Sequence, residues 1–92
     1  MFRYFPKNQK AQEARLFKQF GKVAEEFREV EQAYLKADRD NLLEECFDLI
    51  QAVEGLIDHV TDNDEEERRG YYSRVFVKCA ARGDYEKKEG EE

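Results

Sequence analysis

Apolar residues recur between positions 16 and 34 at alternating four- and three-residue steps, a spacing that places them along one side of an α-helix. They are Leu16, Phe20, Val23, Phe27, Val30 and Tyr34. The only Pro is at position 6, so no proline interrupts a helix after that point. The pattern predicts a helix from Lys7 to about Lys36, with Gly21 as either a kink or a break between two helices.

Two more helices are predicted downstream. Residues 38–41 form a turn, and Asn41 is expected to cap a helix that runs from about Leu42 to Val60. Its apolar stripe is Leu42, Cys46, Leu49, Ile50, Val53, Leu56, Ile57 and Val60. The last helix should begin near Asp64 and end near Arg82, before Gly83. Its inward side is expected to carry Tyr72, Val75, Phe76, Cys79 and Ala80. These patterns predict an all-α fold, an antiparallel bundle of three to four helices.

The size of the chain limits the core that it can build. With 92 residues, of which 41% are charged and 40% apolar, it is expected to be one small domain of amphipathic helices. Because so small a domain buries a modest core, we expect dimerisation or tetramerisation to complete the bundle. Residues 1–6 should form an extended N-terminal arm, 7–85 a single helical domain, and 86–92 a disordered acidic tail.

The charge balance excludes some classes of partner. A net charge of −6 argues against binding a nucleic acid or an anionic membrane, although a polyphosphate is accessible when metal ions lie between the negative charges. The sequence has neither an 18-residue apolar run nor a signal-peptide pattern, so a cytoplasmic location is expected. Cys46 and Cys79 are far apart in the sequence and are expected to be buried free thiols.

Two acidic pairs are the candidate functional residues: Glu26-x-x-Glu29 in the first long helix and Glu45-x-x-Asp48 in the second. Carboxylates three residues apart on a helix share a side, with Cβ atoms roughly 5–6 Å apart. Both pairs border the apolar stripe on the same flank, so they can meet at the edge of the core if the helices pack antiparallel. Their mutual repulsion would then be relieved by a divalent cation such as Mg²⁺. The alternative is ordinary solvated decoration of a helix.

These motifs resemble a known signature. Glu25-Glu26-x-x-Glu29, fifteen intervening residues and Glu45-x-x-Asp48 are similar to the metal-binding motif of MazG-like all-α nucleoside triphosphate pyrophosphohydrolases. The sequences around both motifs, at 20–30 and 41–52, look similar as well. Residues 81–85 resemble the end of the last helix in short, phage- and Firmicute-type members. The resemblance covers about residues 16–85.

The resemblance implies hydrolysis of a nucleoside triphosphate between its α and β phosphates, releasing the monophosphate and pyrophosphate. It implies Mg²⁺, with Mn²⁺ as a substitute, and an assembly of dimers or dimer pairs. The metal ligands carried over by position are Glu26, Glu29, Glu45 and Asp48. Glu25 would either orient a ligand or accept the proton of the attacking water. The candidate phosphate-binding residues are Lys22, Lys78 and Arg82.

Other readings of the sequence compete with this one. A non-catalytic acidic bundle that dimerises through its apolar stripes predicts no metal dependence and tolerance of Glu29→Ala or Asp48→Ala. A di-iron bundle requires two Glu-x-x-His motifs, and the only histidine, His59, follows Leu56 at that spacing. We expect His59 to be a partly exposed residue at a helix end. The small residues Ala52 and Gly55 indicate either room for a nucleotide or close helix packing.

Overall fold

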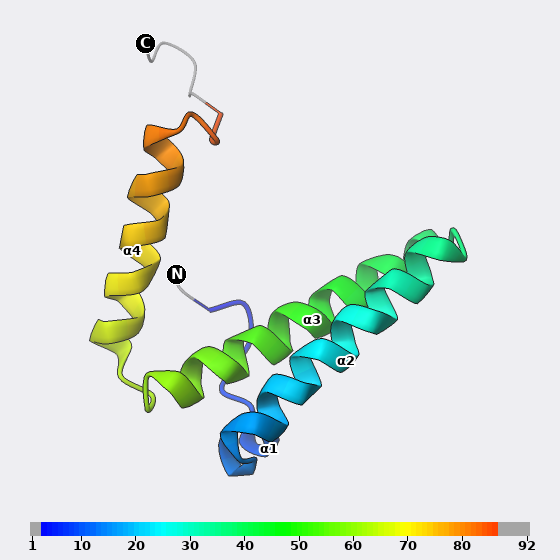
Figure 1. Cartoon of the computed structure of the whole chain (residues 1–92), viewed down its shortest axis with the longest axis horizontal. Helices are drawn as coiled ribbons and strands as arrows, with labels where there is room; N and C mark the ends of the chain where they lie inside the picture. Colours follow the sequence, from blue (N-terminus) through cyan, green and yellow to red (C-terminus); the bar gives the residue numbers. More distant parts are fainter. Residues whose placement is uncertain (1–2, 87–92) are drawn as a thin grey trace.

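A computed structural model describes residues 3–86, and within that range the chain contains four helices and no strand (Figure 1). The helices are α1 (Gln9–Glu13), α2 (Leu16–Leu35), α3 (Arg39–Val60) and α4 (Glu65–Ala81). The all-α prediction is confirmed. None of these helices has the length and apolar character needed to cross a membrane.

Helices α2 and α3 form an antiparallel pair, the largest packing contact in the described part of the chain (Figure 1). Ala37 in the connecting turn has a φ of 56°, which reverses the chain within a few residues. The predicted cap at Asn41 is wrong. Asp38 caps α3, because its Oδ1 accepts the backbone N–H of Asn41 at 3.1 Å, and the helix starts three residues earlier than expected, at Arg39.

The helix predicted from Lys7 to Lys36 is divided, but the break lies at Ala14 and Arg15, whose backbone is extended, rather than at Gly21. The short helix α1 packs on α3 beside Gly55. A Cβ at Gly55 would lie 2.7 Å from Ala11 Cβ and 2.8 Å from Gln19 Nε2. Gly55 therefore serves close packing rather than space for a ligand. His59 is half-buried and contacts the carbonyl oxygen of Ala11.

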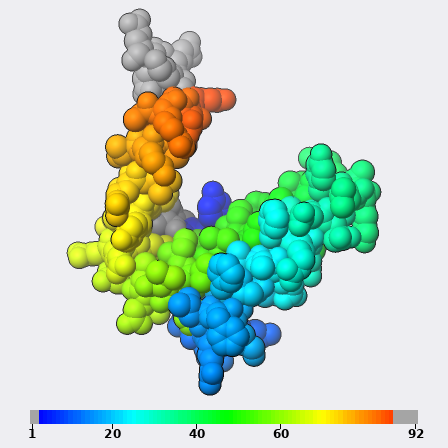
Figure 2. Space-filling model, in the orientation of Figure 1, coloured from blue at the N-terminus to red at the C-terminus, as the bar shows by residue number. Residues whose placement is uncertain are grey.

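Helix α4 projects away from the α2–α3 pair, as Figures 1 and 2 show. Asp64 caps it by accepting the backbone N–H groups of Glu66 and Glu67 at 2.9 and 3.1 Å. Gly83 follows its end with a φ of 78°, which confirms the predicted C-terminal stop. The predicted inward side is wrong for the single chain. Tyr72, Val75, Phe76 and Ala80 are exposed and Cys79 is only half-buried, because α4 does not lie along another helix.

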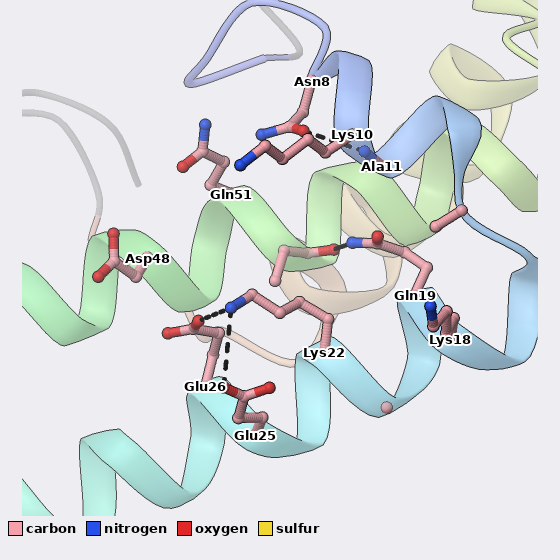
Figure 3. Close-up of a pocket in the computed structure, with 13 residues that line it drawn as sticks. Asn8, Lys10, Ala11, Lys18, Gln19, Lys22, Glu25, Glu26, Asp48 and Gln51 are labelled. Atoms are coloured by element: carbon pink, nitrogen blue, oxygen red, sulfur yellow. Dashed lines mark hydrogen bonds and ion pairs between the residues drawn. The ribbon is translucent and has the colours of Figure 1, made fainter.

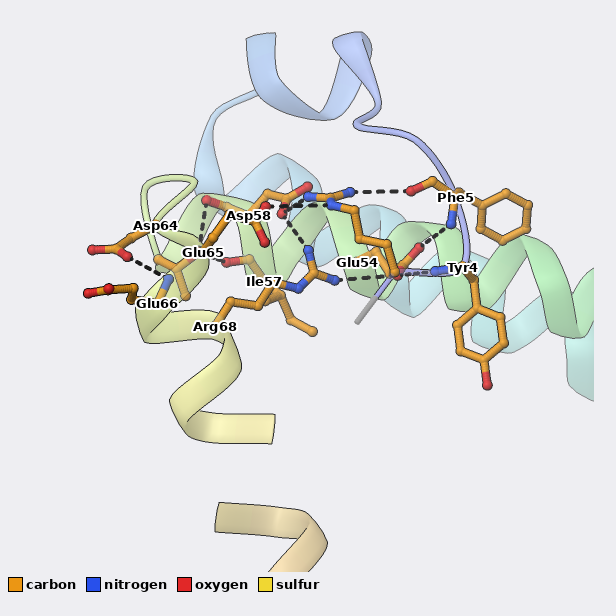
Figure 4. Close-up of polar contacts among 11 residues, drawn as sticks. Tyr4, Phe5, Glu54, Ile57, Asp58, Asp64, Glu65, Glu66 and Arg68 are labelled. Atoms are coloured by element: carbon orange, nitrogen blue, oxygen red, sulfur yellow. Dashed lines mark hydrogen bonds and ion pairs between the residues drawn. The ribbon is translucent and has the colours of Figure 1, made fainter. Parts of the chain in front are cut away.

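A buried group of charged residues fixes the start of α4 on α3 (Figure 4). Arg68 donates from its two terminal nitrogens to Asp58 at 3.0 Å and to Glu54 at 3.3 Å. Arg3 of the N-terminal arm also pairs with Asp58, and Glu54 accepts the backbone N–H groups of Tyr4 and Phe5. We call Arg3, Glu54, Asp58 and Arg68 the ion cluster. It joins the arm, α3 and α4.

The apolar core is small. The buried apolar side chains in the described residues are three alanines, at positions 11, 33 and 52. In the first stripe, Phe20, Phe27 and Tyr34 are 63%, 53% and 71% exposed, so they do not form the core of a single chain. Cys46 and Cys79 are free and half-buried rather than buried. Most of the predicted tail, 87–92, lies outside the described residues, as do 1 and 2 of the arm.

Candidate metal and phosphate site

Three of the four residues predicted to bind metal converge in the structure. Glu26 and Glu29 of α2 and Glu45 of α3 each place one carboxylate oxygen within 4.8 Å of the other two. The three-residue spacing puts the α2 pair on one side of its helix, and the antiparallel packing brings Glu45 opposite. Glu26 is buried, Glu45 is half-buried and Glu29 is exposed. We call these three residues the acidic cluster.

Two oxygens of the acidic cluster lack partners. Oε2 of Glu26 and Oε2 of Glu45 are buried and have no hydrogen-bond partner among residues 3–86. Burial raises the pKa of Glu45, and the neighbouring Glu29 raises it further, followed by the charges of Asp48 and Glu26. An oxygen-rich group that is negatively charged and incompletely hydrogen-bonded is suited to receive a cation.

Lys22 lies on α2 one turn before the cluster and partly neutralises it. Its Nζ is 2.7 Å from Oε1 of Glu26 and 3.9 Å from Oε1 of Glu25. The hydrogen bond to Glu26 raises the pKa of Lys22, so the ammonium remains charged. Lys22 was predicted to bind phosphate, whereas in this structure it is a counter-ion of the acidic residues.

The two remaining acidic residues of the motif, Glu25 and Asp48, line a cavity of about 630 Å³ that adjoins the cluster at Glu26 (Figure 3). The cavity lies between α1, α2 and α3, and such a volume is in the range of small-molecule sites. Asp48 is exposed and is not one of the three converging residues, but its charge contributes to the raised pKa of Glu45. The motif residues therefore occupy one connected region.

Lys78 and Arg82, the other predicted phosphate-binding residues, lie on or just after the last turn of α4. Arg82 pairs with Asp84 at 2.7 Å and donates to Cys79 Sγ at 3.3 Å. Neither residue lines the cavity within one chain, since α4 projects away from it. Two lysines that were not predicted as site residues, Lys10 and Lys18, do line the cavity. The position of Lys10 depends on the break between α1 and α2, which no feature of the sequence predicted at Ala14 and Arg15.

Comparisons with family models, curated proteins and solved structures found no significant match to this chain. The functional interpretation therefore depends on the motifs of this sequence and on the geometry of the acidic cluster and its cavity.

Proposed function

We propose that this chain is a Mg²⁺-dependent nucleoside triphosphate pyrophosphohydrolase that releases a nucleoside monophosphate and pyrophosphate. The observation that carries the proposal is the pair of buried oxygens on Glu26 and Glu45 that lack a hydrogen-bond partner among residues 3–86, and Glu26 also lines the cavity. Carboxylates with unmet hydrogen-bonding capacity favour a hard cation, and the adjoining cavity offers space for its phosphate ligand.

The residues present fit Mg²⁺ or Mn²⁺, both of which prefer oxygen ligands. Glu26, Glu29 and Glu45 would hold the ion, with Asp48 completing the site from α3. When bound, Mg²⁺ would neutralise the triphosphate and acidify the attacking water. Glu26 is buried, and the ion pair of its Oε1 with Lys22 holds the carboxylate in place. Its Oε2 remains available to the metal ion.

Glu25 is the proposed proton acceptor, because its exposed carboxylate lines the same cavity. In the reaction, the oxygen of water bonds to the α-phosphorus, and the bond from that phosphorus to the oxygen bridging the α and β phosphates breaks. Pyrophosphate leaves with the bridging oxygen, and the proton of the water passes to Glu25. The lysines around the cavity contribute positive charge near the phosphates.

The proposed assembly is a homodimer or homotetramer. Large exposed apolar side chains lie on α2 and α4, including Phe20, Phe27, Tyr34, Val75 and Phe76. Extensive apolar exposure marks an interaction surface, and a second copy would cover it while completing a core that one chain lacks. Sedimentation equilibrium at micromolar concentration should give a mass of at least twice the monomer. A monomeric mass would contradict this assembly.

The test of the activity is incubation with Mg²⁺ and a panel of nucleoside triphosphates, with monophosphate and pyrophosphate measured as products. Glu45→Gln should lower the rate about 100-fold, since it removes a ligand of the ion that stabilises the developing charge. Glu44→Gln is the matched control: Glu44 is exposed and outside the acidic cluster, so its rate should stay near wild type. Undiminished activity in Glu45→Gln would contradict the proposal. No turnover by wild type would favour the non-catalytic interaction protein.

A further inference from the structure

Two exposed lysines of the cavity have no role assigned by the motif. Lys10 lies on α1 and Lys18 lies in the first turn of α2, and both line the cavity. Among residues 3–86, neither ammonium group has a hydrogen-bond or ion-pair partner. Lys22 differs, because Glu26 and Glu25 already accompany it.

The position of Lys10 is defined by the packing of α1. Ala11 lies so close to Gly55 that a Cβ added at Gly55 would be 2.7 Å from the Cβ of Ala11. Asn8 caps the helix by accepting the Ala11 N–H at 3.0 Å. Figure 3 shows Lys10 extending from this anchored helix in the direction of Gln51 on α3, on the side of the cavity away from Glu25.

The cavity is thus lined by charges of both signs. Glu25, Glu26 and Asp48 provide negative charge from α2 and α3, whereas the exposed Lys10 and Lys18 provide positive charge from α1 and the first turn of α2. A polyphosphate matches both, since it binds lysines directly and binds carboxylates through a divalent cation. A neutral base or sugar offers no charge to pair with these ammonium groups, which are exposed to solvent in the free protein.

We infer that Lys10 and Lys18 bind the β and γ phosphates of the substrate, the part that leaves as pyrophosphate. This inference rests on the proposed function for the identity of the substrate. It replaces Lys78 and Arg82, which lie on the projecting helix, with residues of the cavity itself. Helix α1 and the first turn of α2 then bind the phosphates, whereas α3 and the later turns of α2 supply the metal ligands.

The experiment is calorimetric titration of the full chain with inorganic tripolyphosphate in the presence of Mg²⁺. The variants are Lys10→Gln, Lys18→Gln and the double variant, with Lys36→Gln as the matched control. Lys36 is also an exposed lysine, but it lies at the far end of α2 and does not line the cavity. The double variant should bind at least about tenfold more weakly, a loss of about 1.4 kcal/mol, whereas Lys36→Gln should bind like wild type.

Several outcomes would overturn the inference: no binding of tripolyphosphate by wild type, an unchanged affinity in the double variant, or an equal loss in Lys36→Gln. Thermal melting by circular dichroism checks that each variant is folded, and Lys10→Arg should restore binding because it keeps the charge. Lysine-dependent binding without turnover of any triphosphate would support this site and reject the proposed function. Turnover of a triphosphate together with binding that does not depend on the two lysines would support the proposed function and reject this site.

Discussion

The ion cluster and the acidic cluster both include carboxylates of α3, but they differ in how those carboxylates are compensated. Glu54 and Asp58 share the guanidinium of Arg68, and each also receives a contact from the N-terminal arm. Among the described residues, Lys22 is the one cation that pairs with the acidic cluster, and of its three carboxylates it pairs only with Glu26. The chain supplies cations to both carboxylates of the ion cluster, whereas it pairs one of the three carboxylates of the acidic cluster with a lysine; under our proposal a metal ion compensates the others.

The difference also concerns which segments are joined. The ion cluster connects residues 3–5, α3 and the first turn of α4, so removing it would release segments distant in sequence. Burying these charges costs desolvation energy, which is offset by the close geometry of the pairs. The acidic cluster connects only α2 and α3, which already pack along their length. It contributes repulsion rather than cohesion in the absence of metal.

The largest stability effect is expected from Arg68→Ala. It leaves Glu54 and Asp58 buried with too few partners, and breaking such a pair typically costs about 3–5 kcal/mol. Urea denaturation should show that loss in the free energy of unfolding. Arg28→Ala, at an exposed position of α2, is the control and should change it by less than about 0.5 kcal/mol. A loss below about 1 kcal/mol in Arg68→Ala would contradict a structural role for the ion cluster.

A smaller effect on the free energy of unfolding is expected when the charge of Glu45 in the acidic cluster is removed in metal-free protein. The pKa of Glu45 is raised in the folded state above its ordinary value of 4.5, so the folded protein binds a proton more tightly than the unfolded chain. The free energy of unfolding should therefore fall as pH rises from about 4.5 through the raised pKa of the folded state.

Glu45→Gln should remove this contribution. In EDTA at neutral pH it should melt above wild type, opposite in sign to Arg68→Ala, and thermal melts across the pH range would show a flatter profile. Glu44→Gln, outside the acidic cluster, should retain the slope of wild type. An identical pH dependence in wild type and Glu45→Gln would indicate that the acidic cluster carries no repulsion.

The sequence predicted the helices well because their apolar spacing is a local property. It failed where competing local signals or distant packing decide the result. Asp38 and Asn41 are both good capping residues, and the sequence alone did not show that Asp38 takes that role. The apolar side of α4 predicted burial, but burial requires a partner surface that one chain does not provide.

For the candidate site, spacing was sufficient to predict that Glu26, Glu29 and Glu45 converge, since helix periodicity and an antiparallel turn determine it. The ion cluster was missed, although Glu54 and Asp58 stand four residues apart beside the apolar stripe. Their partner Arg68 belongs to another helix, so the pairing is tertiary. Lys10 enters the cavity only through the packing of Ala11 on Gly55.

Calorimetric titration of metal-free protein with MgCl₂ tests most directly whether the acidic cluster binds a metal ion. Wild type and Glu44→Gln should show saturable binding and Glu45→Gln should lose it, because Lys22 pairs only with Glu26 of the acidic cluster, and Oε2 of Glu26 and of Glu45 have no partner among residues 3–86. No saturable binding by wild type at millimolar Mg²⁺, or equal binding by Glu45→Gln, would contradict this prediction.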